Sequence, residues 1–217
     1  MKNTGKAILS FIMAAAMILV FASCSLTEAW QKLVVGGMED GTENFDMGIV
    51  EGDVYTSNFA QIKFTLPENW EFYDREKLLE LTGLDADGDA DEVKKELAKK
   101  TTVYDMYAVN PMSGANVIIM FENIKVQGLN PNTFGEEDYA EALMKALDGQ
   151  DAGILYQKKG EKTTQLGGHE FLMMELTVTS SGISLGQNYY IRKVGDFMMS
   201  IVVTGDVDPE SYFAKTE

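Results

Sequence analysis

An apolar run near the C-terminus restricts the fold. Every residue of Phe197–Val203 except Ser200 is apolar. A strand with one face in water alternates apolar and polar residues, so this run is typical of a strand that is covered on both faces. Three other extended segments precede it, at residues 154–158, 170–179 and 187–194, with turn residues between the last of them. The C-terminal part is therefore predicted to be an antiparallel meander.

The first half of the chain mixes strands with helices. Residues 61–66 alternate, with Ile62, Phe64 and Leu66 on one face, which is typical of a half-buried strand. The other expected elements are a short helix at 74–81, a second at 91–99, a hairpin of strands at 102–109 and 115–121, and a longer helix at 136–148 that begins at the capping box Thr133-x-x-Glu136. The pattern predicts an α+β fold with a mostly antiparallel sheet of about six strands flanked by helices.

The N-terminus has the anatomy of an export signal. Lys2 and Lys6 precede residues 7–22, which carry no charge. A membrane-spanning helix needs about 20 apolar residues, and this run is shorter. It ends in Phe21-Ala22-Ser23-Cys24, which resembles the bacterial lipobox. The resemblance implies cleavage before Cys24 and lipidation of Cys24; a plain secretory signal or an uncleaved anchor is the alternative.

This reading divides the chain into three parts. Residues 1–23 are the predicted signal peptide, and residues 48–217 are a single α+β domain. Residues 24–47 are polar and contain glycine, which predicts a flexible tether, although Trp30 and Val34-Val35 could instead dock on the domain. Removing residues 1–23 lowers the net charge from −16 to −18. Anionic lipid would not attract such a chain, so the lipid must hold the protein on the extracytoplasmic face of the cell membrane.

The composition excludes several classes of function. The chain has 34 acidic and 18 basic side chains, which argues against a nucleic-acid partner, because phosphate binding needs clustered lysine and arginine. One cysteine excludes an intramolecular disulfide and a multi-cysteine zinc site, and one histidine excludes a two-histidine metal centre. The sequence therefore predicts no cofactor.

An acidic loop is the one candidate for a metal site. Five acidic residues take positions 1, 3, 5, 7 and 12 of a calcium-binding loop: Asp85, Asp87, Asp89, Asp91 and Glu96. Such a loop needs glycine at position 6 for its sharp turn, where this chain has Ala90. We expect a solvated acidic turn without metal, with calcium binding as the alternative.

No catalytic residue is predicted. His169 is the sole imidazole, and no serine lies in a G-x-S-x-G sequence, which a hydrolase nucleophile often needs. The adjacent pairs Met173-Met174 and Met198-Met199 lie in expected strands. Neighbouring strand residues point to opposite faces, so these methionines are expected to fill the core and not to bind copper.

Three segments together resemble the Mog1/PsbP-like family. They are Phe64-Thr65-Leu66-Pro67-Glu68-Asn69-Trp70, the helix at 136–147, and residues 187–197 with the sequence QNYYIRKVGDF. The resemblance covers residues 48–206 and implies an α/β/α sandwich. The family includes an assembly and ion-retention factor of photosystem II and a protein that binds a small GTPase. It implies a binding module, and no functional residue carries over.

The sequence thus predicts a membrane-anchored extracytoplasmic lipoprotein. Its domain is expected to be a non-catalytic binding or assembly module, with a protein or another extracellular ligand as its partner. The alternatives are an extracytoplasmic hydrolase without a recognisable motif and a calcium-dependent adhesion module.

Overall fold

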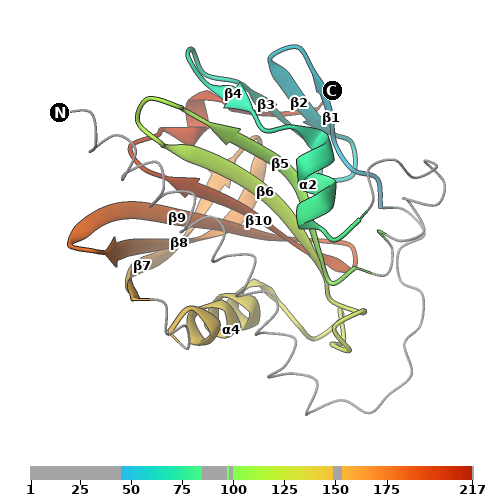
Figure 1. The fold of residues 1–217 in the computed structure, drawn as a ribbon. Coiled ribbons are helices and arrows are strands. Elements are labelled where there is room, and N and C mark those ends of the chain that lie inside the picture. Colours follow the sequence, from blue (N-terminus) through green and yellow to red (C-terminus); the bar gives the residue numbers. More distant parts are fainter. Residues whose placement is uncertain (1–44, 85–96, 98–99, 149–152, 217) are drawn as a thin grey trace.

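The computed structural model describes residues 45–84, 97, 100–148 and 153–216. They form two antiparallel sheets and two helices (Figure 1). The larger sheet contains, in spatial order, β4 (Glu71–Phe72), β5 (Thr102–Val109), β6 (Asn116–Asn123), β10 (Phe197–Thr204), β9 (Ile183–Val194), β8 (His169–Ser180) and β7 (Ile154–Leu166). The smaller sheet contains β1 (Ile49–Glu51), β2 (Val54–Ser57), β3 (Ile62–Thr65) and β11 (Phe213–Lys215). The helices are α2 (Arg75–Leu81) and α4 (Glu136–Asp148), and a 3₁₀ turn, η1 (Pro209–Ser211), precedes β11.

The apolar run becomes β10, the central strand of the larger sheet. It pairs with β6 on one side and β9 on the other, and all eight of its residues are buried. Met198 belongs to the core cluster under α4, whereas Met199 belongs to the cluster under the smaller sheet. Met173 and Met174 are divided between the two clusters in the same way. The prediction of a strand covered on both faces, with methionines on opposite faces, is confirmed.

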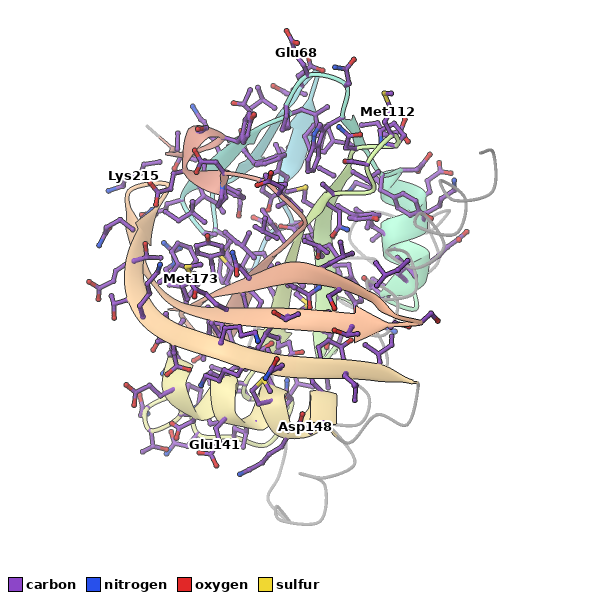
Figure 2. The ribbon with its side chains drawn as sticks, turned by 90° about the vertical axis from the view of Figure 1, so that its left-hand side faces the viewer. Glu68, Met112, Glu141, Asp148, Met173 and Lys215 are labelled. Carbon is purple, nitrogen blue, oxygen red and sulfur yellow. The ribbon has the colours of Figure 1, made fainter. Side chains whose placement is uncertain are left out.

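The two faces of the larger sheet have different covers. The smaller sheet packs on one face through Tyr55, Ile62 and Phe64. Helix α4 packs on the other face through Tyr139, Leu143 and Leu147. Figure 2 shows α4, with Glu141 and Asp148, on the opposite side of the larger sheet from the smaller one. The predicted α+β class is confirmed, with sheets of seven and four strands where about six strands were expected.

Helix α4 has the expected bounds but not the expected cap. Tyr139 donates its backbone N–H to the carbonyl of Gly135, and the Asp138 side chain accepts the N–H of Gly135. Glu136 Oε1 instead accepts the backbone N–H of Lys193. The predicted capping box with Thr133 is therefore wrong, because the Glu136 side chain bonds to the backbone of β9 and not to that of Thr133.

The described chain begins inside the core. Phe45 is buried, and its ring stacks on Phe197 with centroids 4.8 Å apart and meets Phe121 edge-on at 5.3 Å. Residues 45–47 thus belong with the domain expected from residue 48. The rest of the predicted signal peptide and tether lies outside the described residues, as do residues 91–96 and 98–99 of the expected second helix. No helix in the described part is long and apolar enough to cross a membrane.

Candidate functional site

A pocket of about 530 Å³ opens between β1 and α2. We call it the β1–α2 pocket. Its walls are β1, the chain leading into α2, and the middle of β5. The lining residues are Gly48, Ile49, Val50, Phe72, Tyr73, Asp74, Arg75, Leu78, Asp105, Met106 and Tyr107. Asp74 caps α2 by accepting the N–H of Glu76. This cap fixes the start of the helix and therefore the position of Arg75, its first residue.

Asp105 lies at the back of the pocket, at an irregularity in β5. The pairing of β5 with β6 shifts register between Tyr104 and Met106, and such bulges re-aim a side chain. Asp105 is buried, and both of its carboxylate oxygens accept the N–H of Gly48, at 2.9 and 3.0 Å. The hydroxyl of Tyr55 donates to Oδ2 at 2.7 Å. The bulge therefore turns a carboxylate toward the smaller sheet, where it joins the two layers.

The environment of Asp105 suits a structural anion. Burial raises its pKa, while the hydrogen bonds from Tyr55 and Gly48 and the charge of Arg75 oppose the rise. An ionised carboxylate only accepts hydrogen bonds, which matches the donors around it. Burial, and then the nearby Asp105 charge, raises the pKa of Tyr55 well above its usual value, so the phenol keeps its proton. The carboxylate is already occupied by protein donors.

Arg75 holds the other side of Gly48. Its guanidinium donates to the Gly48 carbonyl at 2.6 Å. Gly48 thus donates its N–H to Asp105, and its C=O accepts a hydrogen bond from Arg75. We call these three residues the Gly48 clamp. A Cβ at Gly48 would lie 2.2 Å from the ring of Tyr55, so glycine is needed for this close approach.

The accessible wall of the pocket is aromatic and basic. The rings of Tyr73 and Tyr107 lie 5.3 Å apart, and the ammonium of Lys77 lies 5.3 Å from the Tyr73 centroid. Burial raises the pKa of Tyr107 to about 12, so this phenol keeps its proton. On the opposite side, Ile49 and Val50 are 57% and 43% exposed. Large aliphatic residues this exposed on a strand are candidates for contact with a ligand.

A second buried carboxyl group lies away from this pocket. Glu122 on β6 is 3% exposed, and burial raises its pKa to about 7. Gln127 donates to it at 3.4 Å. Glu122 is packed beside Tyr139 of α4, and Tyr139 accepts a hydrogen bond from Ser200. It is a buried group of the α4 core layer and does not line the β1–α2 pocket.

The residues predicted from sequence lie elsewhere. Cys24 and the calcium candidates Asp85, Asp87, Asp89, Asp91 and Glu96 are outside the described residues, so both expectations stay predictions. His169 bonds through Nε2 with the carbonyl of Gln61 at 3.0 Å, and burial lowers its pKa. It therefore links the start of β8 to the β2–β3 turn. Within the described ranges, no three acidic, histidine or cysteine side chains gather in a way that could hold a metal.

The sequence did not single out Asp105, Arg75 or Tyr107. One signal was present: Asp105 is the one charged residue in the strand Thr102–Val109. A charge within a buried strand must find partners. Its partners come from Gly48 and Tyr55, more than 45 residues earlier, so the pattern alone does not reveal them.

Comparisons with known proteins give no family. No family model matches the chain, and no curated protein does. Similar solved structures include cyanobacterial PsbP (CyanoP) from Synechocystis sp. PCC 6803, which is 10% identical with a TM-score of 0.48; the match covers 83% of this chain and 98% of that one. A structure from Bacteroides thetaiotaomicron VPI-5482 is 11% identical, with a TM-score of 0.41 over 77% of this chain and 50% of that one.

A third solved structure is LpqN, which is involved in cell envelope biogenesis of Mycobacterium tuberculosis. It is 9% identical with a TM-score of 0.32, and the match covers 71% of this chain and 70% of that one. All three TM-scores are below 0.5, so these likenesses carry no argument about function. The fold class stands on the strand order of this chain itself.

Proposed function

We propose that this protein is a lipid-anchored, extracytoplasmic binding module that holds a protein partner through the β1–α2 pocket and has no catalytic role. The observation that carries the proposal is the contrast between the buried carboxylate of the pocket and its accessible lining. The buried carboxylate, that of Asp105, accepts hydrogen bonds from Gly48 and Tyr55. The accessible lining is mostly aliphatic and aromatic, with one exposed arginine, Arg75, and one exposed aspartate, Asp74, which caps α2.

This lining suits binding better than chemistry. A general acid or base must reach the substrate to exchange a proton, and Asp105 already accepts hydrogen bonds from the protein. The pocket residues include no serine, cysteine, histidine or lysine among those described. The pocket also holds two tyrosines and an arginine, which are among the residue types that supply most energy at protein interfaces. A protein partner therefore fits this surface best.

The anchor part of the proposal rests on the N-terminal sequence. Residues 21–24 read Phe-Ala-Ser-Cys after an uncharged run, and multiple acyl chains would hold the protein stably at a membrane. Cells that express the wild type should incorporate radiolabelled palmitate into this protein, and Cys24→Ala should abolish the label. A labelled Cys24→Ala variant would contradict lipidation at this residue.

Site-specific cross-linking in intact cells tests the binding role. A benzophenone amino acid is introduced at Tyr73, in the pocket, or at Leu155, which is 72% exposed on β7. Position 73 should give a discrete cross-linked protein in the membrane fraction, and position 155 should not. Equal products from both positions, or none from position 73, would contradict binding at the pocket.

A further inference from the structure

Among the described residues, the outer edge of β1 has no strand beside it. Unpaired strand edges attract other strands, and proteins usually protect them with lysines, bulges or short length. The β7 edge carries Lys158, Lys159 and Lys162 and a bulge between Lys158 and Gly160. The β4 edge has two residues, and the turn at Gly167 packs against β11. The outer edge of β1 is also short, at three residues, but both of its exposed aliphatic residues, Ile49 and Val50, lie beside the β1–α2 pocket.

The open edge centres on Val50. Along an extended chain, the N–H and C=O groups of successive residues point to alternating edges. Gly48 points both of its groups away from β2, toward Asp105 and Arg75. Val50, two residues later, therefore points its N–H and C=O the same way. The Gly48 clamp occupies this edge at Gly48, and the next outward-pointing pair is free for another strand.

Hollows lie on both faces of this edge. Cross-strand pairing places Val50 on the face of Tyr55, toward the β1–α2 pocket, and Ile49 on the face of Thr56. On that second face a hollow of about 350 Å³ is lined by Ile49, Glu51, Thr56, Asn58, Lys63 and Thr216. A strand added to β1 would thus place its alternate side chains over two different hollows, which is how strand addition gains specificity.

We infer that a partner protein adds an extended segment to β1 as a fifth strand of the smaller sheet. The residue opposite Val50 exchanges both backbone hydrogen bonds with it and places an apolar side chain in the β1–α2 pocket. A residue two positions away lies on the same face and reaches Arg75, so an acidic side chain fits there. This inference rests on the proposed function, because it names the partner's chemistry at the same pocket.

The charges argue against a second copy of this chain as the partner. Pairing β1 with itself about a two-fold axis at Val50 would place Gly48 and Gly52 of the second copy two positions from the residue opposite Val50, so the second copy would offer no carboxylate to Arg75 on that face. The net charge of −16 also makes two copies of the chain repel each other. A foreign segment with a carboxylate for Arg75 has the opposite complementarity.

Fluorescent hexapeptides test the inference by anisotropy on the full chain in detergent micelles. All peptides are acetylated and amidated and carry one leucine or phenylalanine and one glutamate among threonines. One set spaces the two residues at i and i+2, on the same strand face. The matched set spaces them at i and i+1, on opposite faces. We expect the first set to bind at least tenfold more tightly, and N-methylation of the apolar residue to abolish its binding.

Three variants of the protein test which of its residues contact the peptide. Val50→Pro removes the outward N–H without removing a β1–β2 bond, so it should weaken the i, i+2 peptides at least tenfold while a thermal melt stays close to wild type. Arg75→Gln should remove the preference for glutamate over glutamine in the peptide. Lys63→Gln, on the other face, is the control and should leave that preference intact.

The outcomes separate the two proposals. Equal binding of the two peptide sets, or indifference to both N-methylation and Val50→Pro, would overturn strand addition. If Tyr73 still cross-linked a protein in cells, the pocket would remain a binding site of another kind. No cross-link and no peptide binding would overturn both.

Discussion

At the scale of single residues, Gly48 joins the two layers of the fold at the pocket. Its N–H and C=O are both held by side chains, from Asp105 on the larger sheet and Arg75 on α2. The ring of Tyr55 lies where a Cβ would be. A methyl group at this position must therefore displace the tyrosine that donates to Asp105.

Gly48→Ala should lower the free energy of unfolding by about 1–3 kcal/mol, the usual cost of overpacking. Gly186→Ala is the matched control, since a Cβ there meets nothing within 4 Å, and alanine costs a strand less than glycine does. Urea denaturation measures both variants. A Gly48→Ala variant as stable as Gly186→Ala would show that the clamp tolerates a side chain.

Glu122 makes the stability of the fold depend on pH. Burial raises its pKa from 4.5 to about 7, so the folded protein binds a proton that the unfolded chain releases. The contribution of Glu122 to stability is therefore greatest below about pH 4.5, falls as the pH rises to about 7, and then levels off. The loss for this group is about 3 kcal/mol, because one pKa unit corresponds to 1.36 kcal/mol.

Glu122→Gln should remove this loss. The advantage of the variant over wild type should grow by about 3 kcal/mol between pH 4.5 and pH 8. Taking the difference cancels Asp105, whose pKa is also raised. Glu71→Gln, on an exposed side chain, serves as the control in urea denaturation at both pH values. A difference that is the same at both pH values would mean that Glu122 ionises normally.

At the scale of elements, Phe45 shows that the domain includes the segment leading into β1. Its ring contacts Phe59, Phe121 and Phe197. Phe45→Ala should cost about 3–5 kcal/mol, as for other large aromatic residues in a core. Ile49→Ala, at a 57% exposed position, should cost less than about 0.5 kcal/mol. Similar melting temperatures for the two variants would place Phe45 outside the cooperative unit.

The edge of β7 carries three lysines and the short edge of β1 carries none, and this difference can be tested. Replacing Lys158, Lys159 and Lys162 of β7 by threonine should promote self-association, because lysines on an edge strand oppose pairing with another chain. The unfolding free energy should change little, since exposed ion pairs such as Lys158–Glu161 contribute little. Size-exclusion chromatography over a concentration series detects the association. A variant that elutes like wild type at every concentration would show that the lysines do not protect this edge.

Some of the helices and strands could be predicted from local sequence patterns, and others could not. The β5–β6 hairpin, α4 and the buried β10 follow from local periodicity, and the structure has them at the expected places. Strand β7 was expected to end at residue 158 but continues to Leu166, because it pairs with β8 along its whole length. Its polar half carries no apolar alternation, so pairing and not periodicity makes it a strand.

At the scale of the whole molecule, the candidate site depends on long-range packing. Gly48 and Asp105 are 57 residues apart in sequence, and the pocket exists because the smaller sheet docks on the larger one beside α2. Sequence patterns predicted the strand that holds Asp105. They did not predict which edge would stay open, since that depends on where β11 and the β7–β8 turn pack.

Hydrogen exchange at the amide of Val50, followed by NMR, tests the account most directly. In the free protein this N–H points outward without a strand partner, so it should exchange about as fast as the amide of the exposed turn residue Gly52. Saturation with an i, i+2 hexapeptide should slow it at least tenfold, while the Gly52 amide stays unchanged. A Val50 amide that is already protected in the free protein, or that stays unprotected with the peptide bound, would contradict an open edge at β1 that receives a partner strand.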